Sequence, residues 1–421
     1  MGCSKNLVDS ERLMAMLSDA GYETVAERQQ FKGDVVIINT CGFIGDAKEE
    51  SVNEILRWGQ ARKEGKIKAL YVMGCLSERY RDILPDEMPE VDGWWGKTDW
   101  AGIVTALTRR APSTAPYDRI ITTPRHYAYV KIAEGCNRFC SFCAIPLITG
   151  RYKSRPMDEI EDEIRMLVKR GVKEFNIIAQ DLTNYGSDLY GKVMIVELID
   201  RLAGISGVEW IRLHYGYPAG FPLELIDVMA RHGNVCRYLD IALQHAADPV
   251  LSNMRRHITA DETRQLLDEI RRRCPGIHIR TTLMVGFPGE GEREFEQLLD
   301  FVREQRFERM GAFAYCEEED TYGARHFTDD IPAEVKQQRL DRLMALQEEI
   351  SAEIQQQKVG TTMRVIVDRR EGKYYVCRSE FDSPEVDPVV LVETDRQLKP
   401  GEMTNVRIVE ALPFELIATT V

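Results

Sequence analysis

The sequence predicts an α/β protein built from an N-terminal parallel α/β domain, a central partial barrel of six β/α units and a small C-terminal antiparallel β-barrel. Short apolar, β-rich runs alternate with amphipathic helical patterns over about the first 110 residues, and the same alternation recurs six times between residues 127 and 313. Beyond residue 358 the pattern consists of short β runs separated by turn residues. A chain of 421 residues is long enough for two or three domains.

The N-terminal domain is expected over residues 1–110. Residues 34–39 and 68–73 are continuous apolar runs typical of buried strands, and residues 47–62 form a helical pattern after the first of them. Such alternation favours a parallel sheet covered on both faces. Residues 111–124 contain three prolines and several Ser and Thr residues, which indicates a linker.

The central domain is expected over residues 125–330. Its predicted strands are 128–132, 175–179, 210–213, 238–242, 279–285 and 309–314. Six units are too few for a closed eight-fold barrel, so an open or partial barrel is expected, with function gathered at the carboxyl ends of its strands. A long helical pattern over residues 332–357 predicts a helical connector spanning 331–358.

The C-terminal domain is expected over residues 359–421. Its β runs are 363–370, 373–381, 388–394 and 405–412, a pattern typical of a small antiparallel barrel. The segment carries eight Lys and Arg against eleven Asp and Glu, a net charge of −3. This charge has the wrong sign for a barrel that grips nucleic acid and the right sign for one that attracts a basic protein.

The overall composition is that of an ordinary globular protein. Hydrophobic residues make up 44% and charged residues 29%, and the net charge of −13 argues against binding nucleic acid through the overall field. No apolar run approaches the roughly 20 residues that span a bilayer, and the start resembles no signal peptide. We therefore expect a cytoplasmic protein without a membrane partner, whose ten cysteines form no disulfide framework and of which any that cluster serve metal binding or catalysis.

The strongest motif is Cys136, Cys140 and Cys143, which follows the first predicted barrel strand. Three thiolates within eight residues can satisfy three irons of a four-iron cluster and leave the fourth iron open to an exchangeable ligand. Zinc is the alternative, but it usually takes four protein ligands, and His126 and His214 are not spaced as in a zinc finger. The motif therefore favours an iron–sulfur cluster.

Three further cysteines, Cys3, Cys41 and Cys75, lie far apart in the sequence. Cys41 and Cys75 each follow a predicted strand directly, so parallel pairing would bring both to one edge of the sheet, where open α/β sheets bind ligands. A second cluster is one interpretation of this placement. The other is three unconnected cysteines that behave as small buried hydrophobic residues.

The spacing of the central motif resembles that of the radical S-adenosylmethionine (SAM) enzymes. The segments GCSKNLVDSE (2–11), INTCGFIGDAKEES (38–51), VMGC (72–75) and GCNRFCSFCAIPLITGRYKSRP (135–156) resemble the methylthiotransferases of that superfamily, and the similarity covers nearly the whole chain. Within the family, the opening segment, the AQD-x-T-x-YG pattern at 179–186 and HYGYP at 214–218 resemble the RimO branch.

This resemblance implies two 4Fe–4S clusters and SAM as cofactors. Cys136, Cys140 and Cys143 would hold the radical cluster, Cys3, Cys41 and Cys75 an auxiliary cluster, and the last domain would be a TRAM barrel. One SAM would methylate a sulfur on the auxiliary cluster, and cleavage of a second would give a radical that removes hydrogen from the substrate. A low-potential electron donor would reduce the radical cluster.

The RimO branch modifies the β-carbon of an aspartate in ribosomal protein S12, so the resemblance implies that substrate. The tRNA-modifying MiaB branch and, in a different class, a non-catalytic iron–sulfur or zinc RNA-binding module remain alternatives. Contact with SAM is expected from Gln180, Arg212 and Gly286, which lie in or directly after the second, third and fifth barrel strands.

Each of these three residues also has a purely structural interpretation, as a capping turn, a strand-end charge or a plain turn glycine. The family places a strand ahead of its leading cysteine, whereas Cys3 is the third residue here. A start upstream of Met1 or loss of that strand would account for the difference. Cys236, Cys274, Cys316 and Cys377 lack partners at ligand spacing and are expected to be structural.

Overall fold

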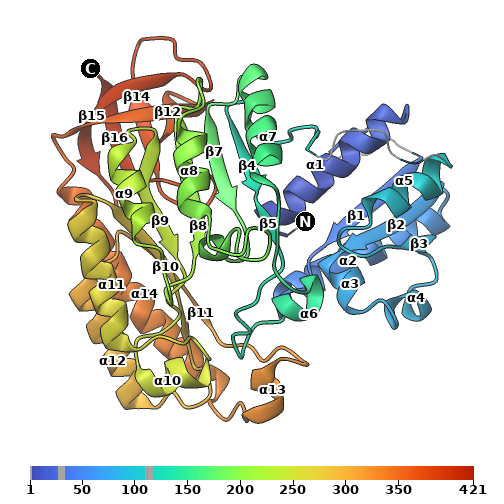
Figure 1. Ribbon diagram of the computed structural model, residues 1–421, viewed down its shortest axis with the longest axis horizontal. Helices are drawn as coiled ribbons and strands as arrows, with labels where there is room; N and C mark the ends of the chain where they lie inside the picture. The colour runs from blue at the N-terminus through green and yellow to red at the C-terminus, as the bar shows by residue number, and fades with distance from the viewer. Residues whose placement is uncertain (1, 27–33, 110, 112–116) are drawn as a thin grey trace.

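The computed structural model describes residues 2–26, 34–109, 111 and 117–421. An N-terminal α/β unit lies beside the β4 edge of a central six-stranded sheet, and a C-terminal β-barrel lies at the opposite end of that sheet's strands from the loop that follows β4 and β5 (Figure 1). This arrangement confirms the predicted fold class.

The N-terminal unit contains a three-stranded parallel sheet in the order β1-β2-β3. Its strands are β1 (Val35–Thr40), β2 (Ala69–Gly74) and β3 (Gly93–Trp94). Its helices are α1 (Ser4–Asp19), α2 (Gly45–Lys63), α3 (Cys75–Arg79), α4 (Leu84–Glu87) and α5 (Trp100–Thr108). The two long strands and α2 match the prediction, whereas β3 has two residues and carries no hydrophobic run by which to recognise it.

The central sheet has six parallel strands in the order β11-β10-β9-β8-β7-β4 and is open, as predicted. Its strands are β4 (Tyr127–Lys131), β7 (Glu174–Ile178), β8 (Trp210–Gly216), β9 (Val235–Ile241), β10 (His278–Val285) and β11 (Arg309–Ala314). A short hairpin, β5 (Ala133–Glu134) with β6 (Lys153–Ser154), follows β4. The connecting helices are α6 (Ile145–Thr149), α7 (Met157–Lys169), the 3₁₀ turn η1 (Leu182–Asn184), α8 (Ile195–Ala203), α9 (Glu224–Arg231), α10 (Asp248–Asn253), α11 (Ala260–Arg273), α12 (Glu292–Gln305) and α13 (Tyr322–His326).

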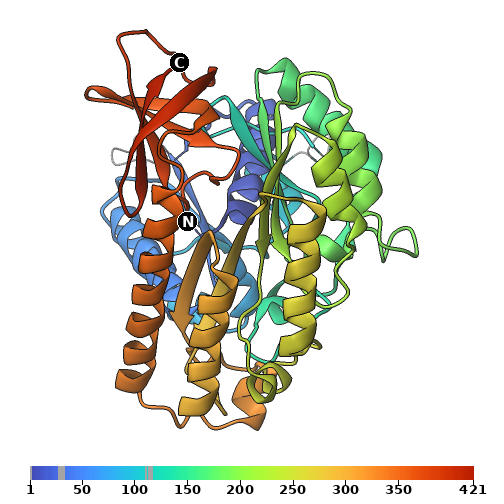
Figure 2. The ribbon, with the colours of Figure 1, turned by 90° about the vertical axis from the view of Figure 1, so that its left-hand side faces the viewer.

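The connector helix α14 (Ala333–Gln356) packs along β11 and leads to the C-terminal barrel (Figure 2). That barrel is closed in the order β12-β13-β14-β16-β15. Its strands are β12 (Thr362–Glu371), β13 (Tyr374–Ser379), β14 (Val389–Glu393), β15 (Met403–Ala411) and β16 (Glu415–Thr420). Neighbouring strands are antiparallel except β14 and β16, whose parallel pairing closes the barrel.

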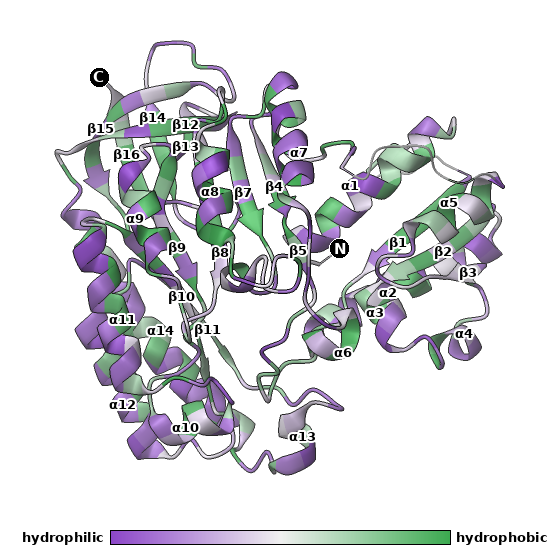
Figure 3. Cartoon of the chain, in the orientation of Figure 1, coloured by the Kyte–Doolittle hydropathy of each residue, from purple (hydrophilic) through white to green (hydrophobic). Residues whose placement is uncertain are grey.

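Hydrophobic residues concentrate on the strands, and hydrophilic residues on the outward faces of the helices (Figure 3). The largest buried cluster joins the central strands to the helices that cover them, as expected when amphipathic helices pack on a parallel sheet. Among the described residues, no helix combines the length and apolar character needed to cross a membrane.

The predicted linker 111–124 lies partly outside the described residues, and its last part is packed against the domains. Arg119 is fully buried, donates to Glu11 of α1 over 2.8 Å and pairs with Glu163 of α7 over 2.9 Å. Glu11 also accepts the backbone N–H of Thr122 at 2.6 Å. Through these contacts, this segment joins α1 to α7 of the central domain.

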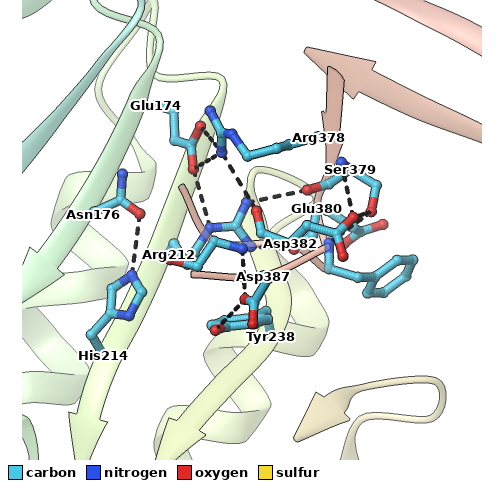
Figure 4. A network of polar contacts seen from close by, with 12 residues as sticks. Glu174, Asn176, Arg212, His214, Tyr238, Arg378, Ser379, Glu380, Asp382 and Asp387 are labelled. Carbon is cyan, nitrogen blue, oxygen red and sulfur yellow. Dashed lines mark hydrogen bonds and ion pairs between the residues drawn. The ribbon is translucent and has the colours of Figure 1, made fainter. Parts of the chain in front are cut away.

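A buried ionic network joins the central sheet to the C-terminal barrel (Figure 4). Glu174, the first residue of β7, accepts from Arg212 of β8 at 3.1 Å and from Arg378 of β13 at 2.9 Å. Arg212 also donates to the carbonyl of Glu380 at 2.5 Å. A second pair joins Arg309 to Asp382 at 2.6 Å. Since buried charges are tolerated only when paired, this network fixes the position of the barrel.

This network predicts that acid weakens the docking of the C-terminal barrel. Burial raises the pKa of Asp382, but Arg309 and Lys358 outweigh it and bring the pKa to about 2, below the ordinary 3.8. A lowered carboxyl pKa stabilises the fold above the unfolded pKa, and this contribution, about 2 kcal/mol, is lost as the pH falls from about 4 toward 2. Urea midpoints measured from pH 5 to pH 2 should therefore converge for wild type and Asp382→Asn. A constant difference across that range would contradict the prediction.

Candidate functional site

The loop that follows β5 holds Cys136, Cys140 and Cys143 close to the carboxyl end of the sheet. Gly135 starts this loop with a φ of +78°, and a Cβ there would lie 2.2 Å from the carbonyl oxygen of Arg151, so only glycine fits. Phe139 also has a positive φ, of 49°. The three thiols lie near one another, because Cys140 and Cys136 both act electrostatically on Cys143.

Nitrogen donors surround these thiols. The backbone N–H of Arg138 donates to Cys136 Sγ at 3.5 Å, and Arg256 Nη1 donates to Cys140 Sγ at 3.1 Å. Burial raises the pKa of Cys136 to about 11 and also raises the pKa of Cys143. Donors aimed at sulfur compensate part of this burial and suit thiolate ligands of an anionic cluster.

The donor set fits an iron–sulfur cluster better than a single metal ion. Among the described residues, no three His, Cys, Asp or Glu side chains converge closely enough to hold one ion. Zinc requires donors about 2.0–2.3 Å from a common centre. A cluster instead gives each thiolate its own iron, so it spans thiols that are farther apart.

The structure brings Cys3, Cys41 and Cys75 together at one edge of the N-terminal sheet. Thr40 and Gly74 are paired at the ends of β1 and β2, so Cys41 and Cys75 follow at neighbouring positions. Cys3 caps α1, and a Cβ on its neighbour Gly2 would lie 3.1 Å from Cys41 Cβ. The parallel register thus brings Cys41 and Cys75 to the same edge of the sheet, as the sequence predicted.

Asn6 of α1 holds this arrangement. Its side-chain nitrogen donates to the carbonyl of Thr40 at 3.0 Å, and Cys75 Sγ donates to its side-chain oxygen at 3.7 Å. Burial raises the pKa of Cys75 to about 12. The desolvation of Cys3 is instead outweighed by the Lys5 cation and the backbone N–H of Asn6, so its pKa is lowered.

The interface between the domains brings Cys75 of one set next to the loop that holds the other set. Cys75 packs in a buried cluster with Ala144 and Ile148, and Ala144 directly follows Cys143. Contacts between α3 and α6 carry this packing. This contact buries Cys75 at the interface, whereas Cys3 is exposed.

A buried polar network reinforces the same interface. Lys97 of the N-terminal unit and Lys131 of β4 both donate to Glu134, which lies two residues before Cys136. Lys131 also donates to Asp9 of α1. Because Lys97 and Lys131 are almost fully buried, these contacts hold the two cysteine loops in a fixed relation.

Two glutamines that follow strands of the central sheet have buried side-chain oxygens without a hydrogen-bond partner among the described residues. Gln180, directly after β7, donates its side-chain nitrogen to Glu134, while its Oε1 is buried without a hydrogen-bond partner among the described residues. Gln244, which follows β9, has a φ of 74° and a buried Oε1 in the same condition. Buried carbonyl oxygens of this kind suit a ligand that donates hydrogen bonds, such as an amino group.

Arg212 and Gly286 lie in different surroundings. Arg212 is enclosed by the C-terminal barrel at the amino-terminal half of the sheet. The Gly286 N–H donates to Glu290 at 2.9 Å, and a Cβ on Gly286 would lie 2.4 Å from Lys336 Cγ of α14. Neither set of contacts supports binding of SAM. For Arg212 and Gly286, contact with SAM therefore stays a prediction.

Sequence reasoning missed Arg256, Gln244 and Lys97. Gln244 follows a predicted strand as Gln180 does, so the strand-end rule would have found it. Arg256 and Lys97 lie in irregular segments, and no local pattern marks them. Of the cysteines expected to be structural, Cys236, Cys274 and Cys377 are buried, whereas Cys316 is exposed.

Comparison with known families agrees with this three-part organisation. Residues 130–302 match the Radical SAM superfamily, residues 1–96 match the uncharacterized protein family UPF0004, and residues 359–421 match the TRAM domain. A radical SAM domain implies a 4Fe–4S cluster and SAM.

Among solved structures, the radical SAM methyltransferase TsrM from Kitasatospora setae, with tryptophan substrate and a SAM analogue bound, shares the fold. Its TM-score is 0.54 at 15% identity, and the match covers 95% of this chain and 79% of that one.

Full-length relatives are much closer in sequence. The ribosomal protein uS12 methylthiotransferase RimO of Phocaeicola vulgatus is 57% identical over 420 residues, covering 100% of this chain and 97% of the relative. The protein of the same name from Parabacteroides distasonis is 56% identical, covering 99% and 96%. The chain therefore belongs to the RimO family of radical SAM methylthiotransferases.

Proposed function

We propose that this enzyme methylthiolates the β-carbon of an aspartate in ribosomal protein uS12, using two SAM molecules and two 4Fe–4S clusters. The observation that carries the proposal is the presence of two three-cysteine sets on either side of one domain interface, where Cys75 packs with Ala144 and Ile148. The names of the full-length relatives supply the substrate.

Cys136, Cys140 and Cys143 would hold the radical cluster, and Cys3, Cys41 and Cys75 the auxiliary one. When bound, the clusters and SAM supply the hydrogen-abstracting radical, the sulfur and the methyl group. A low-potential electron donor is the further partner that this chemistry calls for.

The chain's own residues bind, orient and shield these groups. The Gln180 Oε1 would accept a hydrogen bond from the amino group of SAM, and its amide nitrogen is already fixed on Glu134. Arg256 directs an N–H at Cys140 and is itself oriented by a bond to the carbonyl of Ala242. Tyr217 donates to the Arg256 carbonyl at 2.9 Å and so helps to hold Arg256 in position beside the loop.

The charge of the C-terminal barrel supports a protein substrate over tRNA. Its net charge of −3 repels a polyphosphate backbone and attracts the basic surface that an RNA-binding ribosomal protein carries.

The proposal is tested with the anaerobically reconstituted enzyme, SAM and a low-potential reductant. When uS12 and tRNA are offered together, mass spectrometry should find hydrogen replaced by one methylthio group on a uS12 aspartate and unmodified tRNA. Modified tRNA adenosine with unmodified uS12 would favour the MiaB activity. Absence of any SAM cleavage would favour a non-catalytic module.

A further inference from the structure

Two cavities lie next to each other where the open sheet meets the C-terminal barrel. The inner cavity, about 510 Å³, borders Cys3, which caps α1. The outer cavity, about 470 Å³, lies between β11, α14 and the C-terminal barrel. Arg280 of β10 and Val386 of the loop between β13 and β14 line both, so these two side chains stand where the cavities adjoin.

We propose that the two cavities form one passage for a loop of the substrate protein, in which Arg280 binds the carboxylate of the target aspartate and the outer cavity binds basic residues that flank it. This inference rests on the proposed function and deepens it, because it names the residue that selects the target side chain.

The bonding of Arg280 leaves donors for a ligand. It donates to Asp240 at 3.2 Å and pairs with Asp387 at 3.5 Å, and its side chain is 22% exposed. A guanidinium has five N–H donors arranged in a planar fork, which matches a carboxylate in two-point contact. Several of these donors therefore remain available on the cavity side.

The two carboxylates that orient Arg280 also accept hydrogen bonds from other groups. Asp387 also accepts from Tyr238 at 2.7 Å and from the Ser383 N–H at 2.8 Å. Figure 4 shows the contact of Asp387 with Tyr238. Asp240 also accepts the Tyr215 N–H at 3.2 Å. The guanidinium is thus pre-oriented before a ligand arrives, which lowers the entropic cost of binding.

The charges of the passage complement a basic loop that carries one acidic residue. The outer cavity is lined by Glu308, Asp341, Glu348 and Asp387, against Arg280 and Arg309. Arg309 is committed to Asp382, at 2.6 Å. Arg280 also pairs with Asp240 and Asp387, but it lines both cavities and keeps N–H donors that no described residue accepts, so it can bind a further carboxylate within a rim that attracts Lys and Arg.

The position of the inner cavity suits the reaction. Cys3, a proposed ligand of the auxiliary cluster, and Arg280 both line it, together with Tyr129 and His214. A side chain held by its carboxylate at Arg280 would thus lie in the cavity that borders the proposed sulfur source. The exposed Phe414 at the outer cavity offers an apolar contact for the chain that leads in.

The test uses two fluorescently labelled peptides that copy the target loop of uS12, one with the aspartate and one with asparagine in its place. We expect the reconstituted wild-type enzyme to bind the aspartate peptide about tenfold or more tightly than the asparagine peptide, as a charge-assisted contact requires. In Arg280→Gln this ratio should fall to about one, while the affinity for the asparagine peptide stays within about threefold of wild type.

Two further variants distinguish recognition of the aspartate carboxylate from a general effect on structure or on attraction of the peptide. Arg237→Gln removes an exposed pair with Glu380 that also joins the sheet to the C-terminal barrel but lines neither cavity, so it should leave the ratio unchanged. Glu348→Gln should weaken both peptides equally, by a fewfold, because it removes only an attraction for basic flanks.

An unchanged ratio in Arg280→Gln, or an equal loss for both peptides, would overturn the assignment of Arg280 and leave the proposed function intact. Failure of wild type to bind either peptide, together with binding of tRNA, would instead overturn the proposed substrate and this inference with it.

Discussion

Replacing Cys140 with alanine is expected to abolish SAM cleavage and to lower the iron content of the reconstituted enzyme from about eight to about four atoms per chain. Cys140 is buried within its loop, and its sulfur accepts the Arg256 N–H at 3.1 Å. Loss of this thiolate leaves two ligands for a cluster that takes three from this loop, and it also removes one acceptor of the buried Arg256 guanidinium, which keeps the carbonyl of Ala242. Iron and sulfide analysis under anaerobic conditions, with chromatography of 5′-deoxyadenosine, measures both effects.

Two matched variants complete this test. Cys41→Ala should also remove about four irons, yet it should keep SAM cleavage, because Cys41 belongs to the other set. Cys274→Ala removes a buried thiol that lies in the hydrophobic core of the central domain, so the iron content should not change. If Cys140→Ala retains about eight irons, or if Cys41→Ala stops SAM cleavage, the division of six cysteines into two independent sets is wrong.

Much of the fold could be predicted because buried parallel strands are marked by continuous apolar runs. All six central strands lie within a few residues of their predicted positions, and β11 has the predicted bounds. The meeting of Cys41 and Cys75 also followed from the sequence, because parallel pairing of two strands places their carboxyl ends side by side. The strands β3 and β16 were missed since two residues, or a run beside Pro413, give no periodic signal.

The parts that could not be predicted depend on contacts between distant segments. Arg256 reaches Cys140 across 116 positions, and Lys97 reaches Glu134 across 37. Arg212 shows the opposite case. Its place in a barrel strand predicts contact with SAM, and nothing near it in the sequence indicates that Ser379 and Glu380, in a domain more than 160 residues later, accept its hydrogen bonds. The docking of a separate domain leaves no trace in the local pattern around such a residue.

The same network supports the second large effect, on stability. Glu174→Gln is expected to lower the free energy of unfolding of the unit formed by the central and C-terminal domains by about 3–5 kcal/mol. Glu174 is fully buried and is shared by two fully or nearly fully buried guanidinium groups, those of Arg212 and Arg378. Glutamine keeps the volume of the side chain but removes the negative charge, so two cations remain close together with one carboxylate fewer.

The remaining acceptors cannot replace that charge. Arg378 keeps Asp368, at 2.7 Å from its Nε. Among the described residues, Arg212 keeps the carbonyls of Ser379 and Glu380 as hydrogen-bond acceptors, beside the rings of Trp210 and Tyr238. A buried guanidinium bound by neutral oxygens alone retains most of its desolvation cost. Because these contacts also join the two domains, the C-terminal barrel should become more accessible to protease under native conditions.

A surface pair at the same interface provides the control. Glu209 and Arg364 also join the central domain to the C-terminal barrel, at 2.6 Å, but both side chains are nearly half exposed. Glu209→Gln should therefore cost less than about 1 kcal/mol. Urea unfolding of the two variants, followed by circular dichroism, compares them directly. An equally small loss of unfolding free energy in both variants would mean that solvent reaches Glu174 and that the network does not hold the barrel. A large loss confined to Glu174→Gln would show that the buried ionic network attaches the C-terminal barrel to the central domain.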